Sequence, residues 1–387
     1  NATDVFLTSA QPDSIPALWN GAFQKASYHA GTVRNAHILS SDGKRLEYVR
    51  QKNVPAGTPC FYLAKSQAAV GKNIPIEIKD DWMDMDFEAT TVNFKVEEFL
   101  SNTKYTRSTP SVVNGYNIAP TWRRDQPRSV AIPIPPFEKA PIRNKVIYSQ
   151  HADMTDSVSI TISSNAKYCY IYNLIPGTTY HYKVVADNKE VSKGKFTPQG
   201  HLRMLCFNSG SNMRDMGGWT TEDGKKVEYG KIYRGGELHA GFETNMSDAD
   251  MQDFAKLGIA AEFDLRNNDQ VENNTAPTTS ALGSDVPYKY MNQYMFGDDA
   301  LRQDTLIYRT AFNFFADNLN AGRPVYFHCI WGADRTGAMA MLLNGLLGVG
   351  LDQLYKDYEL TSFSKAGLRE KAGIDSKLDY LSTFAGN

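Results

Sequence analysis

The sequence predicts a multidomain protein in which an N-terminal β-rich region and a β-sandwich precede an α/β domain with a mostly parallel central sheet. Three observations support this fold class. The chain has 387 residues, which is enough for two or three domains. Apolar and polar residues alternate in several runs between residues 157 and 185, as in half-buried strands. After Gly200, short apolar runs alternate with helical patterns, which favours parallel strands covered by helices on both faces.

Residues 1–110 are expected to form the β-rich N-terminal domain. Strand-like runs over 45–49 and 91–96 are separated by turn signals such as Ser41-Asp42-Gly43. Four aspartates could bind a hard cation such as Ca²⁺ through their oxygens, but their spacing fits no known coordination pattern. The favoured interpretation is that they form part of a solvent-exposed surface. These residues are Asp80, Asp81, Asp84 and Asp86.

A proline-rich stretch over 107–136 marks the next boundary, because proline at this density is typical of turns, sheet edges and linkers. The β-sandwich is expected over 111–199, with strands over 157–162, 168–172 and 180–185. Residues 174–182 read Leu-Ile-Pro-Gly-Thr-Thr-Tyr-His-Tyr and resemble the turn into a late strand of fibronectin type III domains, which implies a fibronectin type III-like sandwich. Aromatic packing across strands is expected for five tyrosines, with a binding face as the alternative: Tyr168, Tyr170, Tyr172, Tyr180 and Tyr182.

The α/β domain is expected over 200–387. Strands are predicted over 202–207 and 259–263, and Ser247 is a suitable N-cap for the helix that follows it. A further helix around 312–316 precedes an apolar strand that ends at Cys329. Because ligands bind at the carboxyl ends of parallel strands, Cys329 stands where a functional site is expected.

The loop that follows this strand carries the predicted chemistry. Cys329 and Arg335 are five residues apart, and a helical run begins directly after them. Successive backbone N–H groups in such a loop form a nest for an anion and favour the thiolate, which is the nucleophilic form of cysteine. The planar guanidinium of Arg335 can grip two oxygens of a phosphoryl group. The predicted phosphate-binding residues are Ile330, Trp331, Gly332, Ala333, Asp334 and Arg335.

Three residues of this stretch have supporting roles. Gly332 gives the tight curl a permissive backbone. Thr336 stands where a hydroxyl could bond the Cys329 sulfur or assist breakdown of a phosphoenzyme. His328 is expected to be a buried orienting group and not a base.

The complete string, from His328 through Cys329 and Gly332 to Arg335-Thr336-Gly337, resembles the signature of the cysteine-dependent protein tyrosine phosphatase superfamily. It is most similar to bacterial tyrosine and dual-specificity phosphatases whose loop reads His-Cys-x-x-Gly-Lys-Asp-Arg-Thr-Gly. Residues 212–218, 230–234 and 263–266 resemble further landmarks of that family in the same order, so the likeness covers about the last half of the chain. The resemblance implies a phosphatase that works through a cysteinyl-phosphate, without a cofactor or metal.

One departure from the family bears on the substrate. Ala333 stands where the family often carries lysine, and the missing cation argues against highly charged rings. Phosphotyrosine and other aryl phosphates therefore rank above the alternative substrates, which are inositol phosphates and phosphoinositides. Trp331 is placed to narrow or floor the entrance.

A carboxylic acid is expected across the pocket, because the departing oxygen needs a proton. Asp334 is favoured, since it lies in the loop as in the resembled family. Asp298 or Asp299 comes second, about 30 residues before the nucleophile, where related phosphatases carry a mobile acid loop. Asp264, at a strand end, is the third candidate.

Bulk properties limit the partners and the location. A formal charge of −2 gives no basic excess for nucleic acid, and no apolar run reaches the roughly 20 residues of a membrane span. The first residue is Asn1 and not methionine, which indicates a removed targeting segment or a trimmed chain. We expect an exported protein, periplasmic or extracellular, with surface anchoring through the removed segment as one alternative. A further C-terminal segment is expected as well.

The four cysteines form no disulfide framework, and three are expected to be buried: Cys60, Cys169 and Cys206.

Two alternative functions remain at this stage. The chain could be a catalytically silent phosphate-binding scaffold, although an intact Cys329 and Arg335 argue against this. It could also be an adhesion or glycan-binding protein whose β domains bind an unknown partner. The favoured interpretation is a phosphatase acting on a phosphorylated peptide or small molecule.

Overall fold

The computed structural model describes the backbone of five N-terminal strands and most of the remaining chain. The described residues are 5–8, 23–27, 36–39, 45–49, 59–64, 94–116, 127, 129–135, 143–207, 209–238, 246–271, 275, 277–291 and 305–382. Asp298, Asp299, the side chain of Cys60 and the four aspartates between residues 80 and 86 lie outside this description. The chain divides into two units, Asn1–Phe87 and Glu88–Asn387.

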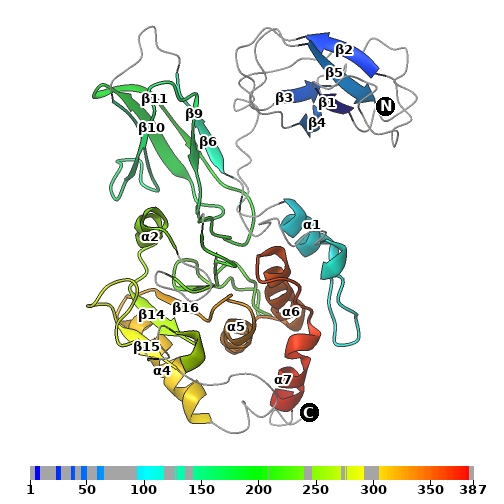
Figure 1. Ribbon diagram of the computed structural model, residues 1–387, viewed down its shortest axis with the longest axis vertical. Helices are drawn as coiled ribbons and strands as arrows, with labels where there is room; N and C mark the ends of the chain where they lie inside the picture. The colour runs from blue at the N-terminus through cyan, green and yellow to red at the C-terminus, as the bar shows by residue number, and fades with distance from the viewer. Residues whose placement is uncertain are drawn as a thin grey trace. The chain divides into compact units, whose positions relative to one another are not determined.

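The first unit contains strands only among its described residues, as predicted for a β-rich N-terminal region (Figure 1). One sheet has the order β1-β5-β2 with antiparallel neighbours, and β3 and β4 form a separate antiparallel pair. The strands are β1 (Val5–Thr8), β2 (Phe23–Ser27), β3 (Ala36–Leu39), β4 (Arg45–Val49) and β5 (Pro59–Ala64).

The strand predicted over 91–96 is wrong, because this segment enters helix α1 (Phe94–Asn102). Val96, Phe99 and Leu100 are spaced for one helical face and are buried against the C-terminal helices of the chain. A short 3-10 helix, η4 (Val113–Gly115), follows and contributes to the same core. The boundary predicted at residue 110 therefore falls inside a segment that packs on the α/β domain.

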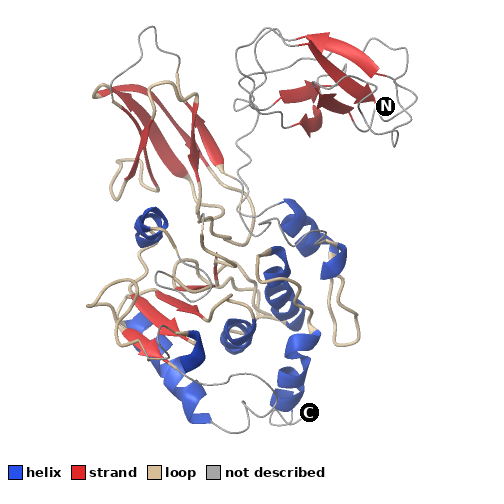
Figure 2. Cartoon of the chain, viewed as in Figure 1, coloured by secondary structure: helices blue, strands red, loops and turns tan. Residues whose placement is uncertain are grey.

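Between residues 130 and 196 the chain forms two antiparallel sheets, of order β11-β10-β7-β8 and β6-β9, and the fibronectin type III-like sandwich stays a prediction. Tyr180 and Tyr182 are buried and pack on Phe196, whereas Tyr170 and Tyr172 are exposed, so the tyrosines divide between packing and surface. Figure 2 shows this region as strands joined by loops. The strands are β6 (Val130–Pro133), β7 (Asn144–Ser149), β8 (Val158–Ile162), β9 (Tyr168–Ile171), β10 (Tyr180–Ala186) and β11 (Lys189–Phe196).

The α/β domain is built on a five-stranded sheet of order β12-β13-β16-β14-β15. The neighbours from β13 to β15 are parallel and β12 is antiparallel, as expected for a mostly parallel sheet. The strands are β12 (Arg214–Asp215), β13 (Ile232–Gly235), β14 (Ala261–Asp264), β15 (Tyr288–Tyr290) and β16 (Val325–His328). The strand predicted over 202–207 is wrong, because only Met204 forms an isolated bridge, to Arg214.

Helices alternate with these strands. Ser247 caps α2 as predicted, because its hydroxyl accepts a hydrogen bond from the Asp250 N–H. No helix in the described ranges is long and apolar enough to cross a membrane. The helical segments are α2 (Asp248–Ala255), η5 (Asn268–Gln270), α4 (Thr305–Asn320), α5 (Asp334–Leu346), α6 (Leu351–Glu359), η7 (Leu360–Phe363) and α7 (Ala372–Ser382).

Strand β16 is the centre of this sheet, and both of its faces are buried. Phe327 packs with Phe315 of α4 and with residues of α5 in one apolar cluster. Tyr326 points to the other face and packs on Phe254 of α2. Because side chains alternate along a strand, this two-sided burial fixes the register of β16 and therefore the position where the chain leaves the sheet.

Candidate active site

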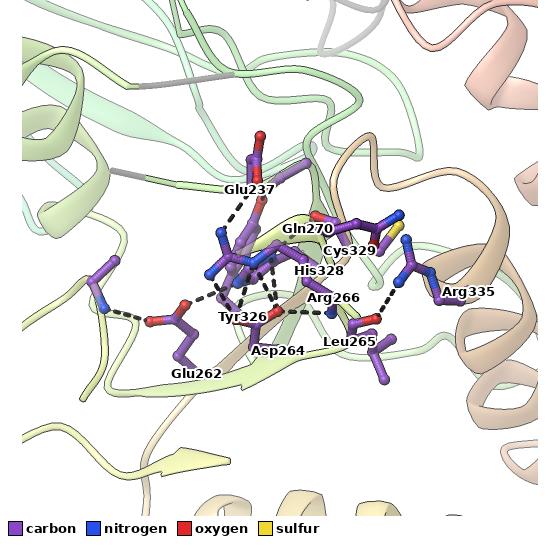
Figure 3. A network of polar contacts seen from close by, with 12 residues as sticks. Glu237, Glu262, Asp264, Leu265, Arg266, Gln270, Tyr326, His328, Cys329 and Arg335 are labelled. Atoms are coloured by element: carbon purple, nitrogen blue, oxygen red, sulfur yellow. Dashed lines mark hydrogen bonds and ion pairs between the residues drawn. The ribbon is translucent and has the colours of Figure 1, made fainter. Parts of the chain in front are cut away.

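Cys329 is the first residue after β16, at the carboxyl end of the central strand, as predicted. Arg335 lies in the first turn of α5 and brings the end of the loop back toward its start. The two side chains point toward one another in Figure 3. Both residues are largely buried, with exposed fractions of 3% for Cys329 and 5% for Arg335. A nucleophile and a guanidinium are thus brought together by one short loop.

Gly332 makes the tight curl of this loop possible. Its φ is +64°, in the left-handed region that favours glycine. A Cβ at this position would lie 2.3 Å from the carbonyl carbon of Gly235 at the end of β13. The loop is also fastened to the next segment, because the Glu237 N–H donates to the Ile330 carbonyl at 2.9 Å. The loop therefore rests directly on the neighbouring strand.

The carbonyl groups of the loop are bound from its outer side. The Gly332 oxygen accepts hydrogen bonds from Asn212 Nδ2 at 2.8 Å and from Arg234 Nη2 at 2.7 Å. Asn212 Nδ2 also lies 3.3 Å from the Trp331 oxygen. In a planar trans peptide the N–H points away from the C=O, so the amides that follow these carbonyls point away from Asn212 and Arg234. An anion on that side would meet N–H donors.

A buried ion cluster holds Arg234 in place. Asp357 of α6 accepts from Arg234 Nη1 at 2.6 Å and from Arg214 Nε at 3.0 Å, and all three side chains are almost completely buried. Burial raises the pKa of Asp357, but the two guanidinium groups lower it further, and the net pKa is below its usual value. Burial and the nearby Arg214 lower the pKa of Arg234 to about 10, against the opposing effect of Asp357. Arg214 and Arg234 thus brace the loop and the fold.

Arg335 is held by the end of β14. Its Nη1 donates to the Leu265 carbonyl at 2.8 Å and to Asn267 Oδ1 at 3.0 Å. Asn267 is itself fixed in a capping box with Gln270, at the start of η5. These contacts fix the orientation of the Arg335 guanidinium at the end of the loop.

His328 lies behind the nucleophile and is buried. Its Nε2 is 2.9 Å from Glu262 Oε1, and its Nδ1 is 3.1 Å from the Cys329 carbonyl oxygen (Figure 3). Burial lowers the pKa of His328, but Asp264 and Glu262 raise it, and the net pKa lies above its usual value. A ring held between two acceptors orients the strand end from which Cys329 emerges.

Asp264 is enclosed in the same network. Arg266 Nη2 donates to its Oδ2 at 2.7 Å, and the Tyr288 hydroxyl donates to the same oxygen at 2.8 Å. Burial raises the pKa of Asp264, yet His328 and Arg266 lower it more, so the net pKa falls. A buried carboxylate with these partners braces the site and is poorly placed to hand a proton to a leaving group.

Asp264, Glu262 and His328 are also the residues that could hold a metal ion in the described part of the chain, since their ligand atoms lie within 4.8 Å of one another. These atoms already have protein partners. Ser280 Oγ and the Ala281 N–H donate to Glu262, while the Arg266 guanidinium neutralises Asp264. The polar contacts among these residues therefore account for the cluster.

Asp334, the favoured acid, begins α5 and is paired with Arg369. Nε and Nη2 of Arg369 donate to the two carboxylate oxygens, at 2.6 and 2.9 Å. The Tyr358 hydroxyl lies 3.3 Å from Asp334 Oδ1. Thr336 is buried, and its hydroxyl has no hydrogen-bond partner within the described ranges. Ala333 is also buried, in the N-cap position of the helix.

Several residues of this site received no role from the sequence, among them Asn212, Asp357, Tyr358 and Arg369. Asn212 has a positive φ of 54°, which asparagine tolerates better than most residues, and it stood inside a recognised landmark. Asp357 and Arg369 come more than 20 residues after the loop from Cys329 to Arg335, and neither belongs to one of the sequence motifs described above. Only their contacts with Arg234 and Asp334 reveal them.

Comparison with known proteins bears on the same domain. Residues 205–380 match the tyrosine phosphatase family. Over 202 residues the chain is 27% identical to an inferred tyrosine-protein phosphatase of Cupriavidus necator, and the alignment covers 44% of this chain and 69% of that protein. The family match includes Cys329, Arg335 and the braces around them. The α/β domain of this chain is therefore similar, over most of its length, to the tyrosine phosphatase family.

Proposed function

We propose that the α/β domain hydrolyses phosphate monoesters, with phosphotyrosine and other aryl phosphates as its preferred class, through a cysteinyl-phosphate. The observation that carries this proposal is the loop from Cys329 to Arg335. Its carbonyls are bound from outside by Asn212 and Arg234, and its two ends carry a nucleophile and a guanidinium.

The reaction begins when the Cys329 sulfur attacks phosphorus in line with the ester oxygen. Arg335 and the inward N–H groups hold the other phosphoryl oxygens and stabilise the charge of the transition state. Water then attacks the cysteinyl-phosphate and releases inorganic phosphate. These residues are pre-positioned by β16, β14 and α5, so little reorganisation accompanies the chemistry.

For the carboxylate that assists proton transfer we favour Asp334, as in the sequence, and the contacts of Asp264 support this choice over that residue. Asp264 is buried and bound by Arg266 and Tyr288, which disfavours it. Asp334 is at the loop and partly exposed, so it is the carboxylate we assign to the reaction. Asp298 and Asp299 lie outside the described residues.

The substrate preference is argued from charge. Ala333 supplies no cation at the loop, and the Arg369 guanidinium, which contacts the loop residue Asp334, is already paired with that carboxylate. The loop therefore offers a polyphosphorylated inositol ring one positive charge fewer than a loop with lysine at position 333 would, whereas an aryl phosphate needs only the loop and Arg335. This supports aryl esters over inositol phosphates and phosphoinositides.

The test is a steady-state assay with p-nitrophenyl phosphate. Cys329→Ser should abolish turnover but retain phosphate binding, measured by calorimetry, because the loop amides and Arg335 are unchanged. Cys206→Ser is the matched control, since Cys206 is a half-buried cysteine outside the loop, and should keep wild-type turnover. Turnover by Cys329→Ser, or none by the wild type across phosphopeptides, phosphoinositides and inositol hexakisphosphate, would contradict the proposal and favour a silent phosphate-binding scaffold.

A further inference from the structure

Residues 94–116, which we call the upstream segment, are built into the core of the α/β domain although they precede it along the chain. They run from α1 through η4 and share one buried apolar cluster with α6 and η7 (Figure 1). The ring of Phe99 lies 5.6 Å from that of Phe363, and the ring of Tyr105 lies 6.0 Å from that of Tyr355. The buried apolar side chains of the upstream segment are those of Val96, Phe99, Leu100, Tyr105 and Val113.

The chain leaves this core and returns to it. Val113, near the end of the upstream segment, and Leu202, which follows β11, are buried in the same cluster. The two antiparallel sheets formed by β6 to β11 lie between them along the chain. The match to the tyrosine phosphatase family begins only at residue 205. The α/β domain is therefore assembled from two stretches of chain, and the first of them lies outside the matched residues.

Glu359, the last residue of α6, joins the two stretches. Its side chain is completely buried. The Tyr105 hydroxyl donates to its Oε2, and the Lys371 N–H donates to its Oε1 at 2.7 Å. The Tyr105 hydroxyl also accepts from the Val112 N–H at 3.1 Å, so the hydroxyl is fixed from both sides. One buried carboxylate thus connects the upstream segment to the chain that follows η7.

Lys371 has a second contact with the upstream segment. Its Nζ donates to the Arg107 carbonyl at 3.0 Å and lies 4.5 Å from the centre of the Tyr355 ring. The Lys371 side chain is buried, so these contacts are shielded from water. The backbone of Lys371 is therefore held through Glu359, and its ammonium group is held directly.

The stretch from Ser362 to Lys371 is a closed loop that carries Arg369. The Arg369 N–H donates to Ser362 Oγ at 2.8 Å, and the same hydroxyl donates to the Arg369 carbonyl at 2.9 Å. The guanidinium of Arg369 binds both carboxylate oxygens of Asp334 at the start of α5. The contacts with the upstream segment fix the far end of this loop, two residues after Arg369.

We propose that the upstream segment is part of the catalytic unit and that Tyr105 is a positioning residue for the loop over 362–371. Its hydroxyl orients Glu359, this carboxylate holds the end of the loop, and the loop presents Arg369 to Asp334. The inference rests on the proposed phosphatase function, in which Asp334 assists proton transfer.

The position of Arg335 does not depend on these contacts. Its guanidinium is held by Leu265 and Asn267 at the end of β14. A change in the upstream segment should therefore act on kcat and leave the binding of phosphate to the loop from Cys329 to Arg335 unchanged.

The test is Tyr105→Phe in the full chain, because it removes one hydroxyl and keeps the ring in the core. The kcat for p-nitrophenyl phosphate should fall by about 10-fold, within the roughly 10²-fold that a misplacement of about 1 Å can cost. The dissociation constant of inorganic phosphate, measured by calorimetry, should stay at the wild-type value. Hydrogen exchange followed by mass spectrometry should be faster over 362–371, where the Lys371 N–H loses an oriented acceptor.

Tyr180→Phe is the matched control. Tyr180 is a buried tyrosine of β10 whose hydroxyl accepts from the Ile175 N–H at 2.9 Å, so this change removes a comparable hydroxyl far from the loop along the chain. It should lower Tm about as much as Tyr105→Phe and leave kcat unchanged. Lys371→Met is a second test that keeps Tyr105 and Glu359. It removes the ammonium group bound to the Arg107 carbonyl and should lower kcat in the same direction.

Wild-type kcat in Tyr105→Phe or, should that variant not fold, in Lys371→Met would overturn the inference alone. An equal loss of kcat and of phosphate affinity would also overturn it, as would the same fall of kcat in Tyr180→Phe, because either result would indicate general destabilisation. A wild type without turnover would overturn the proposed function as well.

Discussion

Replacing Asp357 by asparagine tests whether the buried ion cluster supports the loop. In the wild type, Oδ1 and Oδ2 of Asp357 each accept from one guanidinium, those of Arg214 and Arg234. An asparagine of the same shape keeps one acceptor but turns an NH₂ group toward the other guanidinium. One buried positive charge then faces a donor and lacks a counter-charge.

The magnitude follows from burial. The three side chains are between 0% and 4% exposed, so water cannot replace the lost carboxylate. Breaking a buried ion pair on one side costs about 3–5 kcal/mol, a large part of a domain stability of about 5–15 kcal/mol. For a domain of this size, that corresponds to a fall in Tm of roughly 6–20 °C. Phosphatase activity should fall as well, because Arg234 positions the Gly332 carbonyl.

The assay is thermal unfolding followed by circular dichroism, together with turnover of p-nitrophenyl phosphate below the transition. Asp223→Asn is the matched control, because Asp223 forms an exposed pair with Lys225, and its Tm should equal that of the wild type. Equal Tm values for Asp357→Asn and Asp223→Asn would refute the inference that the buried ion cluster of Arg214, Arg234 and Asp357 stabilises the domain.

Three further predictions concern the loop and its support. Arg335→Lys should lower kcat for p-nitrophenyl phosphate by about 10²–10³-fold, because a point charge cannot replace the fork; near wild-type kcat would contradict this. Gly332→Ala should lose phosphate binding in calorimetry. An alanine in the left-handed φ of this position costs roughly 1–2 kcal/mol, and its Cβ would clash with the Gly235 carbonyl carbon. Retained affinity would argue against a loop that packs on β13. Burial lowers the pKa of His328, but Asp264 and Glu262 raise it more, so the net pKa in the folded protein is above its usual value. Protonated His328 therefore stabilises the folded protein fully below about pH 6.5, and this stabilisation is lost as the pH rises through the folded pKa. Urea unfolding from about pH 6 to about pH 9 should show this decline in the wild type and not in His328→Gln.

The sequence predicted much of the α/β domain because its signals are local. The apolar run before Cys329 predicted β16, and the helical run after it predicted α5, which begins at Asp334. Ser247 predicted the start of α2, because serine is a preferred N-cap residue. Such signals depend on the conformation of a few consecutive residues, which intrinsic preferences and short-range hydrogen bonds control.

Predictions from local sequence patterns were wrong where the same pattern fits more than one backbone conformation. Residues 91–96 alternate like a strand, but Phe99 and Leu100 continue the run with helical spacing, and packing on the C-terminal helices decided for α1. The run over 202–207 is apolar without becoming a strand, since only Met204 reaches a bridging position. Propensity is a weak preference that tertiary contacts override.

The sequence by itself thus determined that a cysteine and an arginine stand at the two ends of one short loop after a strand, because all of this lies within a few consecutive residues. Only the tertiary structure decided what surrounds that loop. Asn212 and Arg234 reach the Gly332 carbonyl across 120 and 98 residues of chain, and Arg369 reaches Asp334 across 35. Contacts between segments so far apart arise from the packing of helices on the sheet, and no spacing or periodicity along the chain records them.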